Sequence, residues 1–258
     1  MTTVLKLGGS VITAKDNPET LDRTALDAAA AAISDGGTDP AGGLVLVHGG
    51  GSFGHHHAAE RGVSANEGTR DAPDVRAVHD AMGRLNAAVL DALGGYGVPA
   101  LPVRPLSAAR RNEAGTVRLS TGAVTTMLAE GFCPVLHGDV IADAGAGATV
   151  ASGDELVVDL ARSLSADRVG LCSTVPGVLD GDGNVVGRVD RFEDVSDAVG
   201  ASGATDVTGG MAAKVRALLD LPIPASVFGA DDLQAFLDGD HPGTLVAGPD
   251  RTARDESP

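Results

Sequence analysis

The chain has 258 residues, 43% of them hydrophobic, and its 19 Lys and Arg against 35 Asp and Glu give a formal net charge of −16. This hydrophobic content excludes a chain that is disordered throughout, and the length suits one domain with a sizeable core. The acidic excess argues against nucleic acid or an anionic membrane as partner, because both are bound through clustered Lys and Arg. It also indicates a halophilic protein from a salt-rich cytoplasm, where ions screen self-repulsion.

Short aliphatic runs alternate along the chain with longer helix-like segments. This repeated strand and helix order predicts an α/β fold, a three-layer αβα sandwich with a central, mainly parallel sheet. Gly-rich turns predict two additional β-hairpins, at Val140–Ala151 and Gly177–Val189. The predicted elements in chain order are Thr3–Leu7 (strand), Leu21–Ser34 (helix), Leu44–His48 (strand), Pro73–Leu93 (helix), Val98–Val103 (strand), Thr121–Glu130 (helix), Cys133–His137 (strand), Gly153–Leu164 (helix), Arg168–Cys172 (strand), Gly210–Leu219 (helix), Ala225–Phe228 (strand) and Asp231–Leu237 (helix).

We expect a single domain over residues 1–248 and a disordered polar tail over 249–258. Cys133 and Cys172 lie in apolar, strand-like runs, which favours buried free thiols over a disulfide or a zinc site. The chain starts with a strand and has no apolar run of eighteen residues, so we expect a cytoplasmic protein.

Lysine is rare in this chain, and its positions are informative. Of the 19 basic residues only Lys6, Lys15 and Lys214 are lysines, and each is close to a glycine-rich turn. A compact ammonium group with three donors suits phosphate oxygens. The alternative is that three remaining lysines fall beside glycines by chance in a chain with 36 glycines.

Glycine-rich turns follow several predicted strands or begin predicted helices. Such turns let backbone N–H groups approach an anion, although tight strand-to-helix turns also need glycine for backbone reasons. The chain has no G-x-x-x-x-G-K-[ST] loop, no G-x-G-x-x-G in its first strand–helix unit and no protein-kinase motif set. The turns therefore predict a phosphate site of a less common type.

Four motifs in this order resemble those of the amino acid kinase superfamily, whose members transfer the γ-phosphoryl group of ATP to a carboxylate, carbamate or phosphate. The resemblance spans about Val4–Val246. Within the superfamily, Lys15 and two further runs resemble the isopentenyl phosphate kinases, which act in archaeal-type isoprenoid biosynthesis. The four motifs are Lys6-Leu7-Gly8-Gly9-Ser10, His48-Gly49-Gly50-Gly51, Ser152-Gly153-Asp154, and Val207-Thr208-Gly209-Gly210-Met211 with Lys214; the two runs are Gly51-Ser52-Phe53-Gly54-His55 and Pro134-Val135-Leu136-His137-Gly138-Asp139-Val140.

The resemblance implies a role for each matching residue. Lys15 would stabilise the transition state, and Asp154 would orient lysines on either side of it. The acceptor phosphate would be bound by Gly49, Gly54, His55 and Gly153; ATP would be bound by Lys6, Gly8, Gly9, Ser10, Gly50, Thr174, Gly210 and Lys214. Positioning and charge neutralisation are what phosphoryl transfer requires of a protein.

The resemblance also implies ATP with Mg²⁺ carried on its phosphates, no metal bound by the protein itself, and a homodimer. It divides the domain into an acceptor-binding lobe over about 1–150 and a nucleotide-binding lobe over about 151–248. Two other functions stay open: a superfamily member acting on an amino-acid carboxylate, UMP or carbamate, and a non-catalytic regulator that binds small molecules.

Two patterns have more than one interpretation. His55, His56 and His57 adjoin on a predicted helix, where side chains point about 100° apart, so we expect His55 alone to face phosphate; the alternatives are an exposed His55 or a metal site. A stripe on the Pro73–Leu93 helix either packs in the core or at a dimer contact, or else forms a wall for an isoprenoid tail; it comprises Val75, Val78, Met82, Leu85 and Val89. Asp16, Asp139 and Asp143 are either catalytic carboxylates or solvated acids, and in so acidic a chain solvation is the default interpretation.

Overall fold

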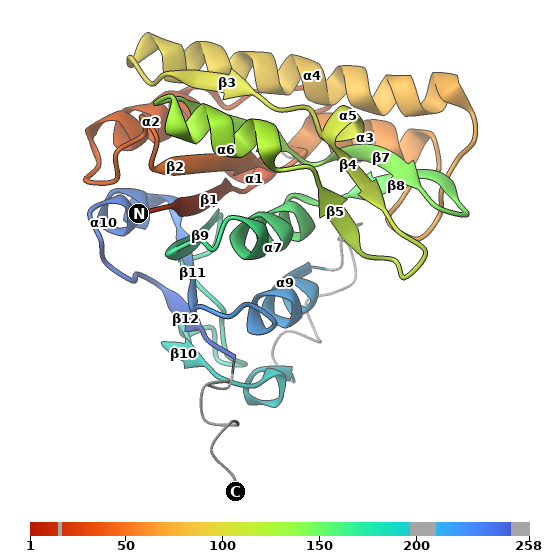
Figure 1. Cartoon of the computed structure of the whole chain (residues 1–258). Coiled ribbons are helices and arrows are strands. Elements are labelled where there is room, and N and C mark those ends of the chain that lie inside the picture. Colours follow the sequence, from red (N-terminus) through yellow and green to blue (C-terminus); the bar gives the residue numbers. More distant parts are fainter. Residues whose placement is uncertain (15–16, 197–209, 249–258) are drawn as a thin grey trace, which may run out of the picture.

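The computed structural model describes residues 1–14, 17–196 and 210–248. Within them, eight strands form a large sheet in the order β10-β12-β11-β9-β1-β2-β6-β3 (Figure 1). All neighbouring strands are parallel apart from the antiparallel pair β11 and β12, so the predicted mainly parallel sheet is confirmed. The strands are β1 (Thr3–Leu7), β2 (Leu44–His48), β3 (Ala100–Pro102), β6 (Cys133–His137), β9 (Arg168–Ser173), β10 (Arg188–Val189), β11 (Ala225–Gly229) and β12 (Thr244–Val246).

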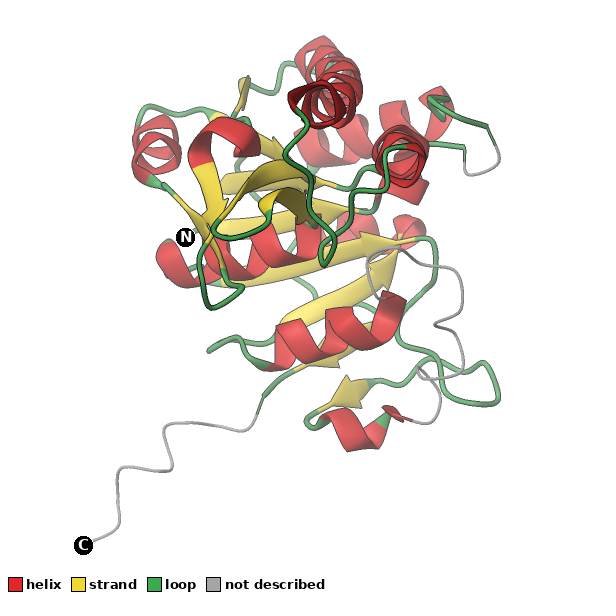
Figure 2. Cartoon of the chain, turned by 90° about the vertical axis from the view of Figure 1, so that its right-hand side faces the viewer, coloured by secondary structure: helices red, strands yellow, loops and turns green. Residues whose placement is uncertain are grey.

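Helices cover both faces of the large sheet, which gives the predicted three layers (Figures 1 and 2). Alternation along the strands separates two cores: in β1, Val4 packs with residues of α7 and α9, whereas Leu5 and Leu7 pack with residues of α2 and α4. One face is covered by α1 (Gly9–Ile12), α2 (Arg23–Asp35), α3 (Gly51–Glu60), α4 (Ala72–Gly95) and α10 (Leu233–Leu237), with the 3₁₀ turn η2 (Ala230–Asp232) before it; the other is covered by α6 (Gly122–Ala129), α7 (Gly153–Ser163) and α9 (Gly210–Leu219). The short elements α5 (Pro105–Ala108) and η1 (Phe192–Asp194) complete the described helices.

A second, small sheet lies beside the large one, in the order β5-β4-β7-β8. The antiparallel pair β7 (Asp139–Asp143) and β8 (Gly147–Ala151) confirms the first predicted hairpin, and the sheet is completed by β4 (Ala109–Arg111) and β5 (Val117–Leu119). The second predicted hairpin, Gly177–Val189, is reduced to one bridge between Leu179 and Val185. Its return arm pairs instead with β12, because the edge of the large sheet offers Arg188 and Val189 a parallel partner.

The long helix α4 shows how local signals fix an element. Asp71 caps its N-terminus by accepting a hydrogen bond from Asp74 N, and Pro73 lies in the first turn. The predicted stripe is buried in the structure from Val78 to Val89, whereas Val75 is half-buried. The stripe is therefore part of the core, and its start also reaches the cavity described below.

Cys133 and Cys172 are buried free thiols, as predicted, and burial raises the pKa of each to about 12.

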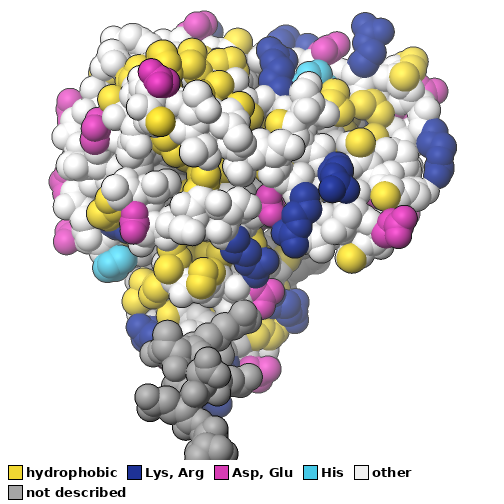
Figure 3. Space-filling view, viewed as in Figure 1, with side chains coloured by type: hydrophobic (Ala, Val, Ile, Leu, Met, Phe, Trp, Pro, Cys, Tyr) yellow, Lys and Arg dark blue, Asp and Glu magenta, His cyan; other side chains and the backbone are white. Residues whose placement is uncertain are grey.

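The surface carries charges of both signs. Acidic side chains are scattered over the face seen in Figure 3, and basic ones gather on its right-hand half. Within the described ranges, none of the helices combines the length and the apolar character needed to cross a bilayer.

Candidate active site

The parallel strands β1, β2, β6 and β9 end at one edge of the large sheet, and a cavity of about 590 Å³ lies there. Lys15 and the segment before Gly210 are outside the described residues. Every other predicted site residue lines this cavity: Lys6, Gly8, Gly9, Ser10, Gly49, Gly50, Gly54, His55, Gly153, Asp154, Thr174, Gly210 and Lys214. The structure thus brings together residues up to 208 positions apart in sequence (214 − 6).

A buried ion pair in the cavity joins β1 to α7. Lys6 is only 8% exposed, and its Nζ lies 2.7 Å from Asp154 Oδ1. Burial acts to raise the pKa of the Asp154 carboxyl, but the charges of Lys6 and Lys214 and the hydrogen bond from Lys6 bring that pKa below its ordinary value. Asp154 is therefore ionised, and two lysines share its negative charge. One surplus positive charge remains in this trio, which suits a polyphosphate.

The N-terminus of α7 is built by a capping box. The Ser152 hydroxyl accepts a hydrogen bond from Glu155 N (3.2 Å), and Ser152 N donates to Glu155 Oε2 (2.9 Å). Gly153 follows the cap and lies under the Lys6 side chain, since a Cβ at Gly153 would be 3.1 Å from Lys6 Cε. A capped helix start with a glycine and the positive end of the helix dipole facing the cavity is favourable for an anion.

The second lysine comes from the far end of the chain. Gly210 begins α9 in the left-handed region (φ 60°), and Lys214 lies one turn later, on the cavity wall. Its charge acts on the Asp154 carboxyl. The glycine is needed here because a side chain strains this backbone conformation.

Two of the glycine-rich loops pack against each other backbone to backbone. A Cβ on Gly9 would be 2.1 Å from Gly51 N and 2.9 Å from the carbonyl carbon of Gly49. Thr13 Oγ1 links the loops further, because it donates to Gly9 O (2.8 Å) and accepts from Ser52 N (3.0 Å). These glycines permit close loop packing, and Gly9 and Gly49 also line the cavity. The N–H group of Gly49 already donates to Leu7 O.

The three adjacent histidines point in different directions. His55 is half-buried and lines the cavity, whereas His56 is exposed. His57 Nε2 lies 2.5 Å from Glu19 Oε1, and this carboxylate also pairs with Arg84. These contacts tie α3 and α4 to the segment that leads from the first glycine loop to α2. The choice of His55 as the cavity residue agrees with the geometry, but His57 has a structural partner that the sequence did not reveal.

Part of the cavity wall is apolar. Ala58, Val63 and Val78 are buried in one small cluster beside Val150, and Met82 lies on the same helix as Val78. All five side chains line the cavity. The cavity can therefore accommodate both a charged and a hydrocarbon group.

Two buried histidines end strands that lead to the cavity, and neither is among the described residues that line it. His48 and His137 end β2 and β6, are fully buried, and have ring centroids 5.5 Å apart. Burial lowers the pKa of both imidazoles, that of His137 to about 3. His48 Nε2 is 3.1 Å from Asn86 Oδ1. Nδ1 of His48 is 3.1 Å from Gly49 O and Nδ1 of His137 is 3.0 Å from Gly138 O, so neutral imidazoles support the turns that follow these strands.

The interpretation of Asp139 and Asp143 as solvated acids is wrong. Asp139 is 1% exposed, lines the cavity and accepts a hydrogen bond from His79 Nδ1 (2.8 Å). Burial raises the pKa of the Asp139 carboxyl, and its hydrogen bond raises the pKa of His79 against the effect of burial. Asp143 lies 3.5 Å from Arg111 Nε. These partners are distant in sequence, so no local sequence pattern could predict the pairs. Asp16 is outside the described residues.

Comparisons with known proteins agree with this architecture. Residues 1–222 match the model of the Amino acid kinase family. The chain is 62% identical over 245 residues to an isopentenyl phosphate kinase from Haloferax volcanii, covering 95% of this chain and 98% of the relative. It is 31% identical over 260 residues to an isopentenyl phosphate kinase from Methanocaldococcus jannaschii, with the same coverage of 95% and 98%. A solved structure of an isopentenyl phosphate kinase superposes with a TM-score of 0.79 at 28% identity, covering 95% of this chain and 100% of the other.

Proposed function

The chain belongs to the amino acid kinase family, and we propose that it transfers the γ-phosphoryl group of ATP to isopentenyl phosphate, giving isopentenyl diphosphate and ADP. The observation that carries this proposal is the composition of the cavity at the strand ends. Lys6, Lys214 and Asp154 offer a cationic site for phosphates, and Val78 and Met82 offer an apolar wall for a branched five-carbon chain. A substrate with a phosphate head and a hydrocarbon tail fits both parts.

On the nucleotide side, Lys6 and Lys214 neutralise the ATP phosphates, and Asp154 keeps the two ammonium groups oriented. Gly8, Gly9, Ser10, Gly50, Thr174 and Gly210 complete the proposed ATP site. Lys15 is proposed to stabilise the transition state, where charge on the transferring group is greatest.

On the acceptor side, His55 donates a hydrogen bond to the phosphate of isopentenyl phosphate, and the backbone N–H group of Gly153 adds a second donor. Gly49 and Gly54 give the phosphate room rather than donors, because their N–H groups already donate to Leu7 O and Gly50 O. An oxygen of this phosphate attacks the γ-phosphorus of ATP, and the bond from that phosphorus to the ADP oxygen breaks. The transfer is direct and in line, so no phosphoenzyme forms.

The residues of the cavity fit a metal ion that is bound by the nucleotide rather than by the protein. The cavity carboxylates Asp139, Asp154 and Glu155 each face a basic partner, so their charge is already balanced by the protein. Mg²⁺ carried on ATP would supply charge neutralisation at the phosphates.

We further propose an acceptor-binding lobe over about 1–150 and a nucleotide-binding lobe over about 151–248. The acceptor residues of the cavity come from the first range, Gly153 apart. Thr174, Gly210 and Lys214 of the proposed ATP site come from the second range, and the first glycine-rich loops of the first range complete that site. The free thiols Cys133 and Cys172 support a reducing cytoplasm. The homodimer stays a prediction from the family resemblance.

The test is an ADP-release assay with ATP, Mg²⁺ and a panel of acceptors. Isopentenyl phosphate should give a kcat/KM far above that of glutamate, aspartate, carbamate or UMP. Preference for one of these other acceptors would reject the proposed substrate, and no ADP release with any of them would favour a binding protein.

A further inference from the structure

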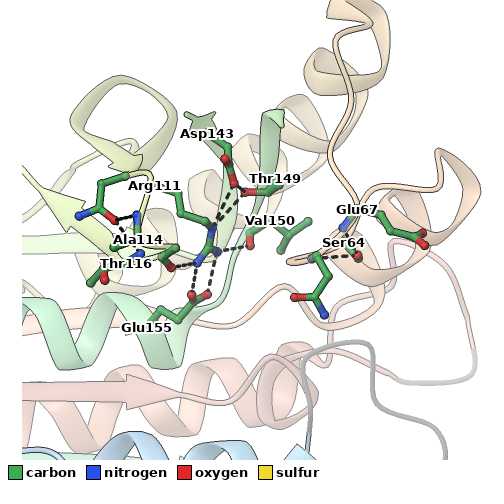
Figure 4. A network of polar contacts seen from close by, with 12 residues as sticks. Ser64, Glu67, Arg111, Ala114, Thr116, Asp143, Thr149, Val150 and Glu155 are labelled. Carbon is green, nitrogen blue, oxygen red and sulfur yellow. Dashed lines mark hydrogen bonds and ion pairs between the residues drawn. The ribbon is translucent and has the colours of Figure 1, made fainter. Parts of the chain in front are cut away.

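A buried arginine joins the small sheet to the start of α7. Arg111 ends β4, is 8% exposed, and donates five hydrogen bonds (Figure 4). Nε donates to Thr149 Oγ1 (3.2 Å). Nη1 donates to Gly115 O (2.9 Å) and Glu155 Oε1 (2.6 Å), and Nη2 donates to Val150 O (2.9 Å) and Glu155 Oε2 (3.3 Å). The five bonds equal the five N–H groups of a guanidinium, and the contact with Glu155 is bidentate.

Contacts within the small sheet hold the Arg111 guanidinium in the orientation in which it binds Glu155. The Asp143 carboxylate lies 3.5 Å from Nε and accepts a hydrogen bond from Thr149 Oγ1 (2.8 Å). Arg111, Asp143 and Thr149 all belong to strands of the small sheet, β4, β7 and β8. The guanidinium is therefore part of a rigid frame, and its outward side faces α7.

Glu155 connects the fixed Arg111 guanidinium to the first turn of α7, which lines the cavity. It is the third residue of α7 and the acidic member of the capping box, so its Oε2 accepts from both Ser152 N and Arg111 Nη2. Gly153 and Asp154 lie between Ser152 and Glu155 and line the cavity. Since Asp154 is 2.7 Å from Lys6 Nζ, the position of this first turn sets the position of the Lys6–Asp154 pair.

We propose that Arg111 is a positioning residue for phosphoryl transfer: by holding Glu155, it fixes the turn that carries Gly153 and Asp154. The inference rests on the proposed kinase function and deepens it. Glu155 lines the cavity, whereas Arg111 is not among the described residues that do, so Arg111 acts through its partner. Displacement of reacting groups by about 1 Å can lower a rate about a hundredfold.

The same helix offers a matched control one turn later. Asp159 accepts from Arg118 Nη1 (2.9 Å) and from Leu119 N (2.8 Å), which joins α7 to β5 of the small sheet. This ion pair also links an arginine of the small sheet to an acidic residue of α7, but neither partner lines the cavity. Loss of Arg118 should therefore affect stability without affecting the position of Asp154.

The experiment compares Arg111→Gln, Arg111→Lys, Glu155→Gln and Arg118→Gln with the wild type by kcat, both KM values and Tm. Arg111→Gln should lower kcat about tenfold to a hundredfold at a temperature where the protein is fully folded. Arg111→Lys should recover little of this loss, because one ammonium cannot replace the planar fork. Glu155→Gln should lower kcat similarly, and the Arg111→Gln/Glu155→Gln double variant should be no slower than the slower single variant. Arg118→Gln should lower Tm and leave kcat unchanged.

Wild-type kcat in both Arg111→Gln and Glu155→Gln would overturn the proposal, as would full recovery by Arg111→Lys or an equal loss of kcat in Arg118→Gln. If Arg111→Gln does not fold, Glu155→Gln decides alone. The acceptor panel is run first on the wild type, so that a wrong substrate is recognised separately. The Arg111 comparison is then made with the acceptor that the enzyme prefers.

Discussion

The contact between the first two glycine-rich loops gives a sharp prediction for Gly9→Ala. The new Cβ would be 2.1 Å from Gly51 N and 2.6 Å from Gly51 Cα, and ordinary van der Waals contact begins at 3.4 Å. The atoms in the way belong to the backbone, so one loop must move by about 1.3 Å, the difference between 3.4 and 2.1 Å. Overpacking of this kind costs about 1–3 kcal/mol of stability. Because Gly9 and Gly49 line the cavity, kcat/KM for ATP should fall about a hundredfold.

The assay measures Tm by calorimetry and kcat/KM by ADP release. A loss of 1 kcal/mol corresponds to a lower Tm by about 2–4 °C in a chain of this size. Gly94→Ala is the control, because Gly94 lies in α4 with nothing within 4 Å of the new Cβ. That variant should keep full activity and gain up to about 1 kcal/mol from helix propensity. Unchanged Tm and kcat/KM in Gly9→Ala would refute the argument that the two loops must touch.

Four further predictions test other parts of the account. Lys15→Ala should lower kcat about a hundredfold, which corresponds to an activation free energy higher by about 3 kcal/mol, and should change KM less. A change in KM alone would show that Lys15 does not stabilise the transition state. His55→Ala should raise KM for isopentenyl phosphate or lower kcat while ATP binding stays intact, and the exposed His56 should tolerate alanine; the reverse result would assign the wrong imidazole. The hydrogen bond to Asp139 raises the pKa of His79 above 6.5, so its stabilisation is complete below pH 6.5 and is lost as the pH rises through the raised value. The loss of unfolding free energy in His79→Gln, measured by urea denaturation, should therefore be larger at about pH 6 than at about pH 9. Equal losses at the two pH values would show that the charged His79–Asp139 pair does not stabilise the fold. Tm should rise between about 0.1 M and molar KCl because salt screens the net charge of −16, and a constant Tm would remove the interpretation of a salt-adapted protein.

The central strands of the large sheet could be predicted from the sequence. β1, β2 and β6 have the predicted ends, because an uninterrupted aliphatic run is typical of a parallel strand that is buried on both faces. The three-residue strands β4 and β5 were missed, since so short a run has no readable period. They are stabilised by pairing within the small sheet, which depends on tertiary contacts.

The site was predictable where its signal is local. The glycine-rich turns and the three lysines stand out in the sequence, and the structure places Lys6 and Lys214 at one cavity. Ser152 followed by Glu155 is a capping-box pattern that could have been recognised from the sequence. Arg111 was not predictable, because its partner Glu155 is 44 residues away and lies on another element. The pairing of His79 with Asp139 was unpredictable for the same reason, because the two residues are 60 positions apart.

The most direct measurement of the proposed function is ³¹P NMR of the protein with ATP, Mg²⁺ and isopentenyl phosphate. We expect the monophosphate singlet of isopentenyl phosphate to decrease while the two coupled doublets of a diphosphate monoester appear, in equal amount to the ADP that forms. The Lys6–Asp154 cavity predicts that Asp154→Asn slows this conversion strongly. An unchanged isopentenyl phosphate singlet while ATP is consumed, or while another acceptor is phosphorylated, would contradict the proposal.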